Sequence, residues 1–119
     1  MCSSDLRNGD LPAWIEYNES GVMLMQGWYR NGHLHREGDL PAEIWYNESG
    51  AIWSQSWYRD GQLHREDEPA LIEYHENGTI ESQRWYRDDR LHREDDRPAL
   101  INYRDSGTIE SQEIGRAHV

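Results

Sequence analysis

The chain has 119 residues, enough for one domain, and its 23 acidic residues against 12 arginines and no lysine give a formal net charge of −11. This charge argues against binding to duplex DNA, duplex RNA or an anionic membrane, because all three need a cationic protein surface. No apolar run approaches the roughly 20 residues of a membrane span, and no signal peptide is visible. We therefore expect a cytoplasmic protein, in the host cytoplasm if the chain is viral.

The elements repeat along the chain with a period of 28 to 29 residues. The motif P-A-x-I-x-Y begins at Pro12 and returns at Pro41, Pro69 and Pro98, in steps of 29, 28 and 29. Six tryptophans and seven tyrosines supply large apolar surfaces, although only 35% of the residues are hydrophobic. A repeat of this length is typical of arrays whose units bury their faces against their neighbours.

Within each unit the side chains alternate with period two, which predicts strands and no helix. Asn-Gly, Asp-Gly and Asp-Asp pairs mark the tight turns, of which Asp-Asp fits least well. The second unit is expected to contain, in chain order, a strand over 42–46, a turn over 47–50, a strand over 51–59, a turn at 60–61 and a return strand over 62–66. The sequence thus predicts an all-β protein, a single-layer antiparallel meander of β-hairpin repeats.

The same alternation assigns side chains to two stripes. Gln55, Trp57 and Arg59 share one face of the long strand, and equivalent residues recur in the neighbouring units. Ile44 and Tyr46 form the second stripe. We expect these stripes to compete for the role of core face, because a single-layer sheet leaves one of its two faces partly exposed.

The stretch W-Y-R-x-x-x-L-H-R-E recurs as WYRNGHLHRE at 28–37, WYRDGQLHRE at 57–66 and WYRDDRLHRE at 85–94. Together with P-A-x-I-x-Y it resembles the MORN repeat, and more closely a divergent MORN-like variant, over about residues 7–112. The resemblance implies an elongated β-hairpin array of about four units with a scaffolding or protein-binding role. Some bacterial members resemble antitoxin or immunity proteins. The sequence departs from the pattern where arginine follows histidine in place of glycine, at Arg36, Arg65 and Arg93.

Two terminal segments, residues 1–6 and 113–119, fall outside the period and resemble translated sequencing adapter. We therefore expect the repeat array over 7–112 to be a slice of a longer array, taken from environmental or phage sequence.

The recurring aromatic and basic residues are the candidate ligand-binding residues. Tryptophan offers a plane for stacking, and arginine offers a fork for an anion. The structural alternative is that the tryptophans pack against the sheet, with arginine and glutamine as a polar rim. The candidates are Trp28, Arg30, His35, Arg36, Trp57, Arg59, His64, Arg65, Trp85, Arg87, His92 and Arg93.

Metal binding and catalysis have weaker support. A metal could be bound by His33 and His35, or by the recurring histidines His35, His64 and His92 with the glutamates two residues after them. Neither set has the spacing of a strong metal-ligand motif. No GxSxG, P-loop or HExxH motif is present. Every column has near-equivalent copies, so no acid and base are singled out. We expect no enzyme, no metal and no cofactor.

Two classes of function remain. The first is sequestration, of phage or viral type, of an anionic nucleotide-like ligand at a homo-oligomer interface that carries the tryptophans and arginines. The second is a protein-binding module: a scaffold, an immunity protein or antitoxin, or an acidic decoy for a cationic partner. The net charge favours the second class. The recurring tryptophans, together with the use of arginine for every cationic side chain, favour sequestration of a nucleotide-like ligand. We prefer this first class.

Overall fold

The computed structural model describes residues 11–114, which consist of strands, turns and loops with one short 3-10 turn. The predicted tail at 1–6 and most of the predicted tail at 113–119 lie outside these described residues. The last strand of the sheet continues through Glu113 to Ile114, two residues beyond the predicted end of the array.

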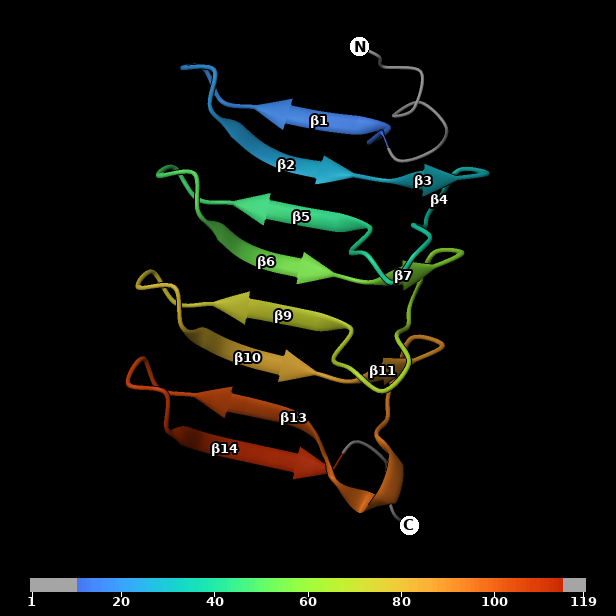
Figure 1. Ribbon diagram of the computed structural model, residues 1–119, viewed down its shortest axis with the longest axis vertical. Helices are drawn as coiled ribbons and strands as arrows, with labels where there is room; N and C mark the ends of the chain where they lie inside the picture. The colour runs from blue at the N-terminus through green and yellow to red at the C-terminus, as the bar shows by residue number, and fades with distance from the viewer. Residues whose placement is uncertain (1–10, 115–119) are drawn as a thin grey trace.

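The main element is an eight-stranded antiparallel sheet in which four β-hairpins follow one another (Figure 1). Each strand pairs with its sequence neighbour in the sheet, so the order is a meander. This confirms the predicted all-β class and the antiparallel meander. In sheet order the strands are β1 (Trp14–Tyr17), β2 (Met23–Gly27), β5 (Glu43–Tyr46), β6 (Ile52–Ser56), β9 (Leu71–Tyr74), β10 (Ile80–Arg84), β13 (Pro98–Tyr103) and β14 (Ile109–Ile114).

Each hairpin of the sheet closes on a turn with a side-chain brace and a glycine. In the second hairpin the Asn47 side-chain oxygen accepts the backbone N–H groups of Ser49 and Ala51 at 3.0 and 3.1 Å. Gly50 has φ of 94°, a left-handed conformation that favours glycine. One extra residue, Trp53, bulges beside this turn. The predicted turn over 47–50 is therefore confirmed.

The long strand predicted over 51–59 divides at Trp57. The Trp57 N–H donates to the Ala70 carbonyl of the next hairpin at 2.7 Å, whereas the Trp57 carbonyl accepts the His64 N–H at 3.0 Å. The chain therefore leaves the main sheet at this residue, and the predicted return strand over 62–66 shortens to two residues. It forms a separate two-stranded ribbon.

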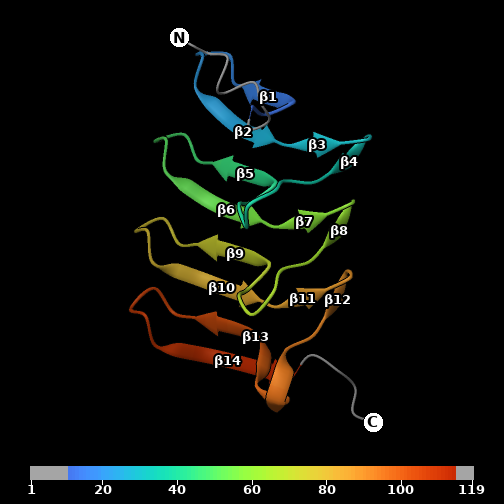
Figure 2. The same ribbon diagram turned by 45° about the vertical axis from the view of Figure 1, so that its right-hand side comes forward.

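Three such ribbons lie in a row beside the sheet, one for each of the first three hairpins (Figures 1 and 2). Their tight turns are left-handed at both central residues, including the Asp88–Asp89 pair, where φ is 51° and 72°. The ribbons pair β3 (Tyr29–Arg30) with β4 (His33–Leu34), β7 (Tyr58–Arg59) with β8 (Gln62–Leu63), and β11 (Tyr86–Arg87) with β12 (Arg90–Leu91).

A loop carries the chain from each ribbon back to the next hairpin. The backbone turns sharply there through residues with positive φ, such as Asp39 at 60° and Asp67 at 63°. In the third unit this loop contains the short 3-10 turn η1 (Glu94–Asp96).

The isoleucine and glutamine stripes lie on the same face of the sheet. Ile44 pairs directly with Gln26 of β2 and with Gln55 of β6. Directly paired residues of antiparallel strands point to one face, so the expectation that the two stripes compete as core faces is wrong. Ile44 and Ile101 on this shared face are each only 8% exposed, but Met25, Ser54 and Ser82 on the opposite face are buried as well, so both faces contribute to the core.

Tyrosine–glutamine hydrogen bonds join each hairpin to the one before it on this face. Such a bond contributes about 1 kcal/mol when it is partly buried. The bonds join Gln26 to Tyr46 at 2.8 Å, Tyr74 to Gln55 at 2.8 Å and Tyr103 to Gln83 at 2.6 Å.

The tryptophans of the recurring stretch complete the core where the sheet meets the ribbons. Trp85 packs with Ala99 and Ile101, and Leu91 and Tyr103 lie against this cluster. Ala42, Ala70 and Ala99 of the last three P-A-x-I-x-Y motifs are fully buried, whereas Ala13 of the first motif is exposed. A larger side chain at any of the three buried positions has no room beside the tryptophan.

Candidate ligand-binding pockets

The structure brings together the candidate residues of each unit. Four candidates from one unit line one surface pocket, at the junction of the ribbon and the loop that follows it. The sets are Trp28, Arg30, His35 and Arg36; Trp57, Arg59, His64 and Arg65; and Trp85, Arg87, His92 and Arg93.

The tryptophan rings are not an open stacking plane. Trp28, Trp57 and Trp85 are 6%, 7% and 6% exposed. In each unit the arginine that follows the histidine covers the ring, with its guanidinium carbon 3.6 to 3.9 Å from the ring centre. The tryptophan rings therefore pack within the structure, as the alternative interpretation of the sequence stated. The expectation that they form an exposed plane or interface is wrong for the single chain.

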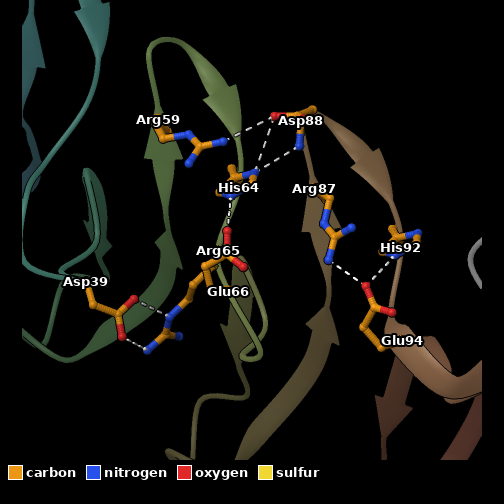
Figure 3. A network of polar contacts seen from close by, with 9 residues as sticks. All are labelled: Asp39, Arg59, His64, Arg65, Glu66, Arg87, Asp88, His92 and Glu94. Carbon is orange, nitrogen blue, oxygen red and sulfur yellow. Dashed lines mark hydrogen bonds and ion pairs between the residues drawn. The ribbon is translucent and has the colours of Figure 1, made fainter.

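The second arginine column is exposed and holds carboxylates of its own chain. Arg30 contacts Glu37 at 2.9 Å and Asp60 at 3.0 Å, and its side chain is 49% exposed. Arg59 contacts Asp88 of the next ribbon at 3.5 Å (Figure 3). Exposed ion pairs contribute only about 0 to 1 kcal/mol each. These arginines can therefore exchange a carboxylate of the chain for another anion at little cost.

His35 and His64 each clamp one ribbon to the next. His64 is 8% exposed, and its Nδ1 accepts the backbone N–H of Asp88 at 3.1 Å (Figure 3). Its Nε2 lies 2.8 Å from the Glu66 carboxylate. An acceptor Nδ1 leaves the proton of the neutral ring on Nε2, where it donates to Glu66. His35 repeats the arrangement with Asp60 and Glu37.

The carboxylates beside the histidines and ribbon arginines have pKa values below their ordinary ones. The hydrogen bond from His64 lowers the pKa of Glu66, and His35 does the same for Glu37. The His92 and Arg87 contacts lower the pKa of Glu94. The hydrogen bond from Arg30 lowers the pKa of Asp60.

The pocket of the second unit is balanced in charge. Three arginines and three carboxylates line a space of about 200 Å³. Arg65 binds the Asp39 carboxylate through Nε at 2.9 Å and through a terminal nitrogen at 3.4 Å (Figure 3). The indole N–H of Trp57 donates to the Asp39 carbonyl at 3.0 Å. One loop residue, Asp39, thus satisfies both the arginine and the tryptophan.

The pocket of the third unit does not repeat the contacts of Asp39, although Asp67 of the equivalent loop lines it. The loop that would supply it reads HREDEPA from His64, one residue shorter than HREGDLPA from His35. Among the described residues, the buried indole nitrogen of Trp85 has no hydrogen-bond acceptor. Within residues 11–114, no carboxylate lies within 4.0 Å of the Arg93 guanidinium, which contacts the Pro98 carbonyl and the Trp85 ring.

Arg97, which the repeat pattern did not predict as a site residue, lines this third pocket together with Arg65, Arg87 and Arg93. Two carboxylates, Asp67 and Glu94, oppose these four arginines. The missed signal was a break in the repeat: the second step of the period is 28 residues in place of 29, and an arginine stands directly before Pro98 where leucine stands before Pro41.

Over residues 11–114, no three histidine, cysteine, aspartate or glutamate side chains are grouped to hold a metal ion. No helix within that range is long and apolar enough to cross a membrane.

Comparison of the chain with protein-family models, with curated proteins and with solved structures finds no significant match to any of them. The likeness to the MORN repeat therefore stands on the quoted motifs, and the function has to be argued from the geometry of the pockets.

Proposed function

We propose that this protein is a non-catalytic binding protein that holds the anionic part of a nucleotide-like ligand in the arginine-lined pockets beside its hairpins. The supporting observation is the convergence of tryptophan, histidine and two arginines in one pocket, three times along the array. Guanidinium groups bind phosphate oxygens through paired, charge-assisted hydrogen bonds.

The two arginine columns have different parts in this proposal. The arginines over the tryptophan rings, such as Arg65, are positioned by stacking and are largely buried. The arginines of the ribbons, such as Arg59, are about half exposed and form weak ion pairs. In this proposal the largely buried arginine fixes the position of the anion, and the half-exposed arginine forms a second ion pair with it.

The size of the pockets limits what they hold. The spaces of about 20, 200 and 170 Å³ are smaller than the roughly 300 Å³ at which sites begin to enclose a drug-sized ligand. A phosphate group fits this scale better than a whole nucleotide. The base of a nucleotide would rest outside the pocket, against exposed groups such as Tyr29, which is 44% exposed.

The repeat identity belongs to the same proposal. A meander of hairpins with a period of 28 to 29 residues supports a MORN-like array. Such an array positions equivalent pockets at regular intervals, and a change in one unit can specialise its pocket without altering the rest.

Isothermal titration calorimetry tests the proposal. Cyclic and linear nucleotides and inorganic phosphate are titrated into the full chain, with adenosine as the uncharged control. We expect heat of binding with phosphate-bearing ligands and none with adenosine, and we expect added salt to weaken the binding. Absence of heat with every phosphate-bearing ligand would contradict the proposal.

A protein-binding function is the second candidate. It is favoured by aromatic side chains left open on an acidic chain: Trp14 is 55% exposed, Tyr17 is 54% exposed and Trp53 is 40% exposed. Exposed aromatic groups are enriched in protein interfaces. Mass spectrometry of material co-purified from cells separates the two candidates, since a released small phosphate compound selects the first and a stoichiometric cationic protein selects the second.

Self-association remains a proposal as well, by a route other than the tryptophan column. The outermost strands of the described sheet, β1 and β14, each pair with one neighbour only. Strands with one open side invite pairing with another chain. Sedimentation equilibrium tests this: we expect a homo-oligomer, and a clean monomer at tens of micromolar would remove this part of the proposal.

A further inference from the structure

The three pockets are not equivalent, and, resting on the proposed function, we infer that the pocket of the third unit is the phosphate subsite. It is bounded by Trp85, Arg87, Arg93 and Arg97, with Arg65 at its rim. Its ligand is the phosphate group of a small molecule, one per chain.

The first observation is an unused hydrogen-bond donor. Trp57 donates its indole N–H to the Asp39 carbonyl. Trp85 occupies the same place in the next unit, is 94% buried, and finds no acceptor for its indole N–H among the described residues. Buried polar groups are satisfied in most proteins, so this one points to an acceptor from outside the described residues. A phosphate oxygen is such an acceptor.

The second observation is a cation, Arg93, that has no carboxylate partner among the described residues. Arg65 is neutralised by the Asp39 carboxylate, whereas Arg93 has no carboxylate within ion-pair distance among residues 11–114. Burial, and then the neighbouring Arg97 cation, lower the pKa of Arg93. Two guanidinium groups held near each other repel, and an anion between them relieves that repulsion.

Both observations have one cause in the sequence. The loop from His64 to Pro69 is one residue shorter than the loop from His35 to Pro41, and its aspartate, Asp67, lines the pocket without making the contacts to Trp85 and Arg93 that Asp39 makes to Trp57 and Arg65. The same pocket gains Arg97 from the following loop. The loss of one anionic contact and the gain of one cation therefore coincide at a single place in the array.

The balance of charge follows from these changes. Four arginines face two carboxylates here, while three face three in the pocket of the second unit. This excess of positive charge lies in a chain whose formal net charge is −11. The local environment, and not the overall charge, therefore selects an anion.

The dimensions indicate how the anion binds. The enclosed space is about 20 Å³, room for one water molecule or one ligand oxygen. One phosphate oxygen enters this space beside Trp85, and the other oxygens remain in the mouth of the pocket, where Arg87 and Arg97 are about half exposed. A tetrahedral phosphate can meet several guanidinium groups at once, which a planar carboxylate does less well.

Calorimetry with inorganic phosphate and with AMP tests this assignment on the full chain. Arg97→Leu introduces the residue that the first unit carries at this place, Leu40, and Arg97 is exposed, so the fold should persist. The matched control is Arg104→Asn, which also removes one positive charge and introduces the residue that the second unit carries there, Asn47. We expect Arg97→Leu to weaken binding about tenfold or more, and Arg104→Asn to leave it within about twofold.

A second variant supplies the missing loop residue. Asp67 and Glu68 are replaced by the Gly-Asp-Leu sequence found at 38–40. The new aspartate should bind Arg93 and accept the Trp85 N–H, so phosphate binding should be lost while resistance to urea is kept or raised. Retained phosphate binding in a variant that resists urea at least as well as the wild type would overturn the subsite.

The outcomes separate this inference from the proposed function. If the wild-type chain binds no phosphate-bearing ligand, both fail. If the wild type binds but Arg97→Leu and the loop variant bind equally well, the function stands and the assignment to this pocket is overturned. Tighter binding of AMP than of inorganic phosphate assigns the site to a phosphate ester, and equal affinity assigns it to free phosphate.

Discussion

Arg65 covers Trp57 with its guanidinium carbon 3.9 Å from the ring centre and at the same time binds the Asp39 carboxylate of the preceding loop. This arrangement explains why tryptophan and arginine recur at fixed spacing. The ring fills the junction between sheet and ribbon, and the arginine closes the junction while tying one unit to the previous one.

Arg65→Lys should lower the free energy of unfolding by about 1 to 2 kcal/mol. Lysine keeps the charge but loses the planar stack and the two-nitrogen contact with Asp39. Urea unfolding followed by tryptophan fluorescence measures the change. The control is Arg59→Lys, whose side chain is 53% exposed and makes one contact at 3.5 Å; it should stay within about 0.5 kcal/mol of the wild type. Equal effects of the two variants would refute the structural role of the stack.

Trp57→Ala should lower the free energy of unfolding by about 3 to 5 kcal/mol, because a nearly buried indole leaves a cavity beside Ala70. Trp53→Ala is the matched control, since Trp53 is 40% exposed on a bulge and its loss should cost much less. Thermal unfolding of both variants checks the expectation. Similar melting temperatures for the two would indicate that Trp57 does not belong to the core.

His64 joins two ribbons because its Nδ1 accepts the backbone N–H of Asp88. The stability of His64 variants should therefore depend on whether the new side chain can accept a hydrogen bond at the position of Nδ1. His64→Asn offers a side-chain oxygen near Nδ1 and should be milder than His64→Ala. The alanine variant leaves the Asp88 N–H without an acceptor and should cost about 2 kcal/mol. Urea unfolding and amide exchange at Asp88 report the difference. Equal destabilisation by asparagine and alanine would argue against the clamp.

Acid should remove part of the stability contributed by the histidine–carboxylate contacts. The folded-state pKa of Glu66 lies below its ordinary value of about 4.3, so the unfolded chain binds more protons in acid. The contribution is therefore complete above about pH 5 and is lost as pH falls through the lowered pKa. Acid also relieves the repulsion among the other acidic residues of the chain. The difference in unfolding free energy between wild type and Glu66→Gln removes that effect and reports the Glu66 contact alone. This difference should shrink on acidification and with added salt. A difference that grows as pH falls would have the wrong sign.

The sequence predicted the class and the order of the fold because turns and alternation are local. Asn-Gly and Asp-Gly specify left-handed turns by themselves, and a strict period of 28 to 29 residues implies that each unit packs like the next. The division of the long strand at Trp57 was not predictable in this way. It depends on the two hydrogen bonds of the Trp57 backbone, because its N–H donates to Ala70 of the next hairpin while its carbonyl accepts from His64 of the ribbon.

The faces of the sheet show a similar limit. Alternation places Gln55 and Trp57 on one side of a strand, but only the register between strands shows that Ile44 stands directly opposite Gln55. Register depends on contacts between units. For the candidate site, the structure brings the residues of the predicted columns into common pockets, but the sequence interpretation treated the copies as equivalent. The difference between the pockets arises from the shorter loop and from Arg97.

The indole N–H signals in a proton–nitrogen correlation spectrum test the central claim most directly. The chain has six tryptophans, hence six such signals, and Trp85→Phe and Trp57→Phe assign the two that matter. Addition of inorganic phosphate or AMP should shift the Trp85 signal, because its N–H gains an acceptor, and should leave the Trp57 signal in place, because Asp39 already accepts that proton. Equal shifts of both signals, or no shift of the Trp85 signal at saturating ligand, would contradict the account.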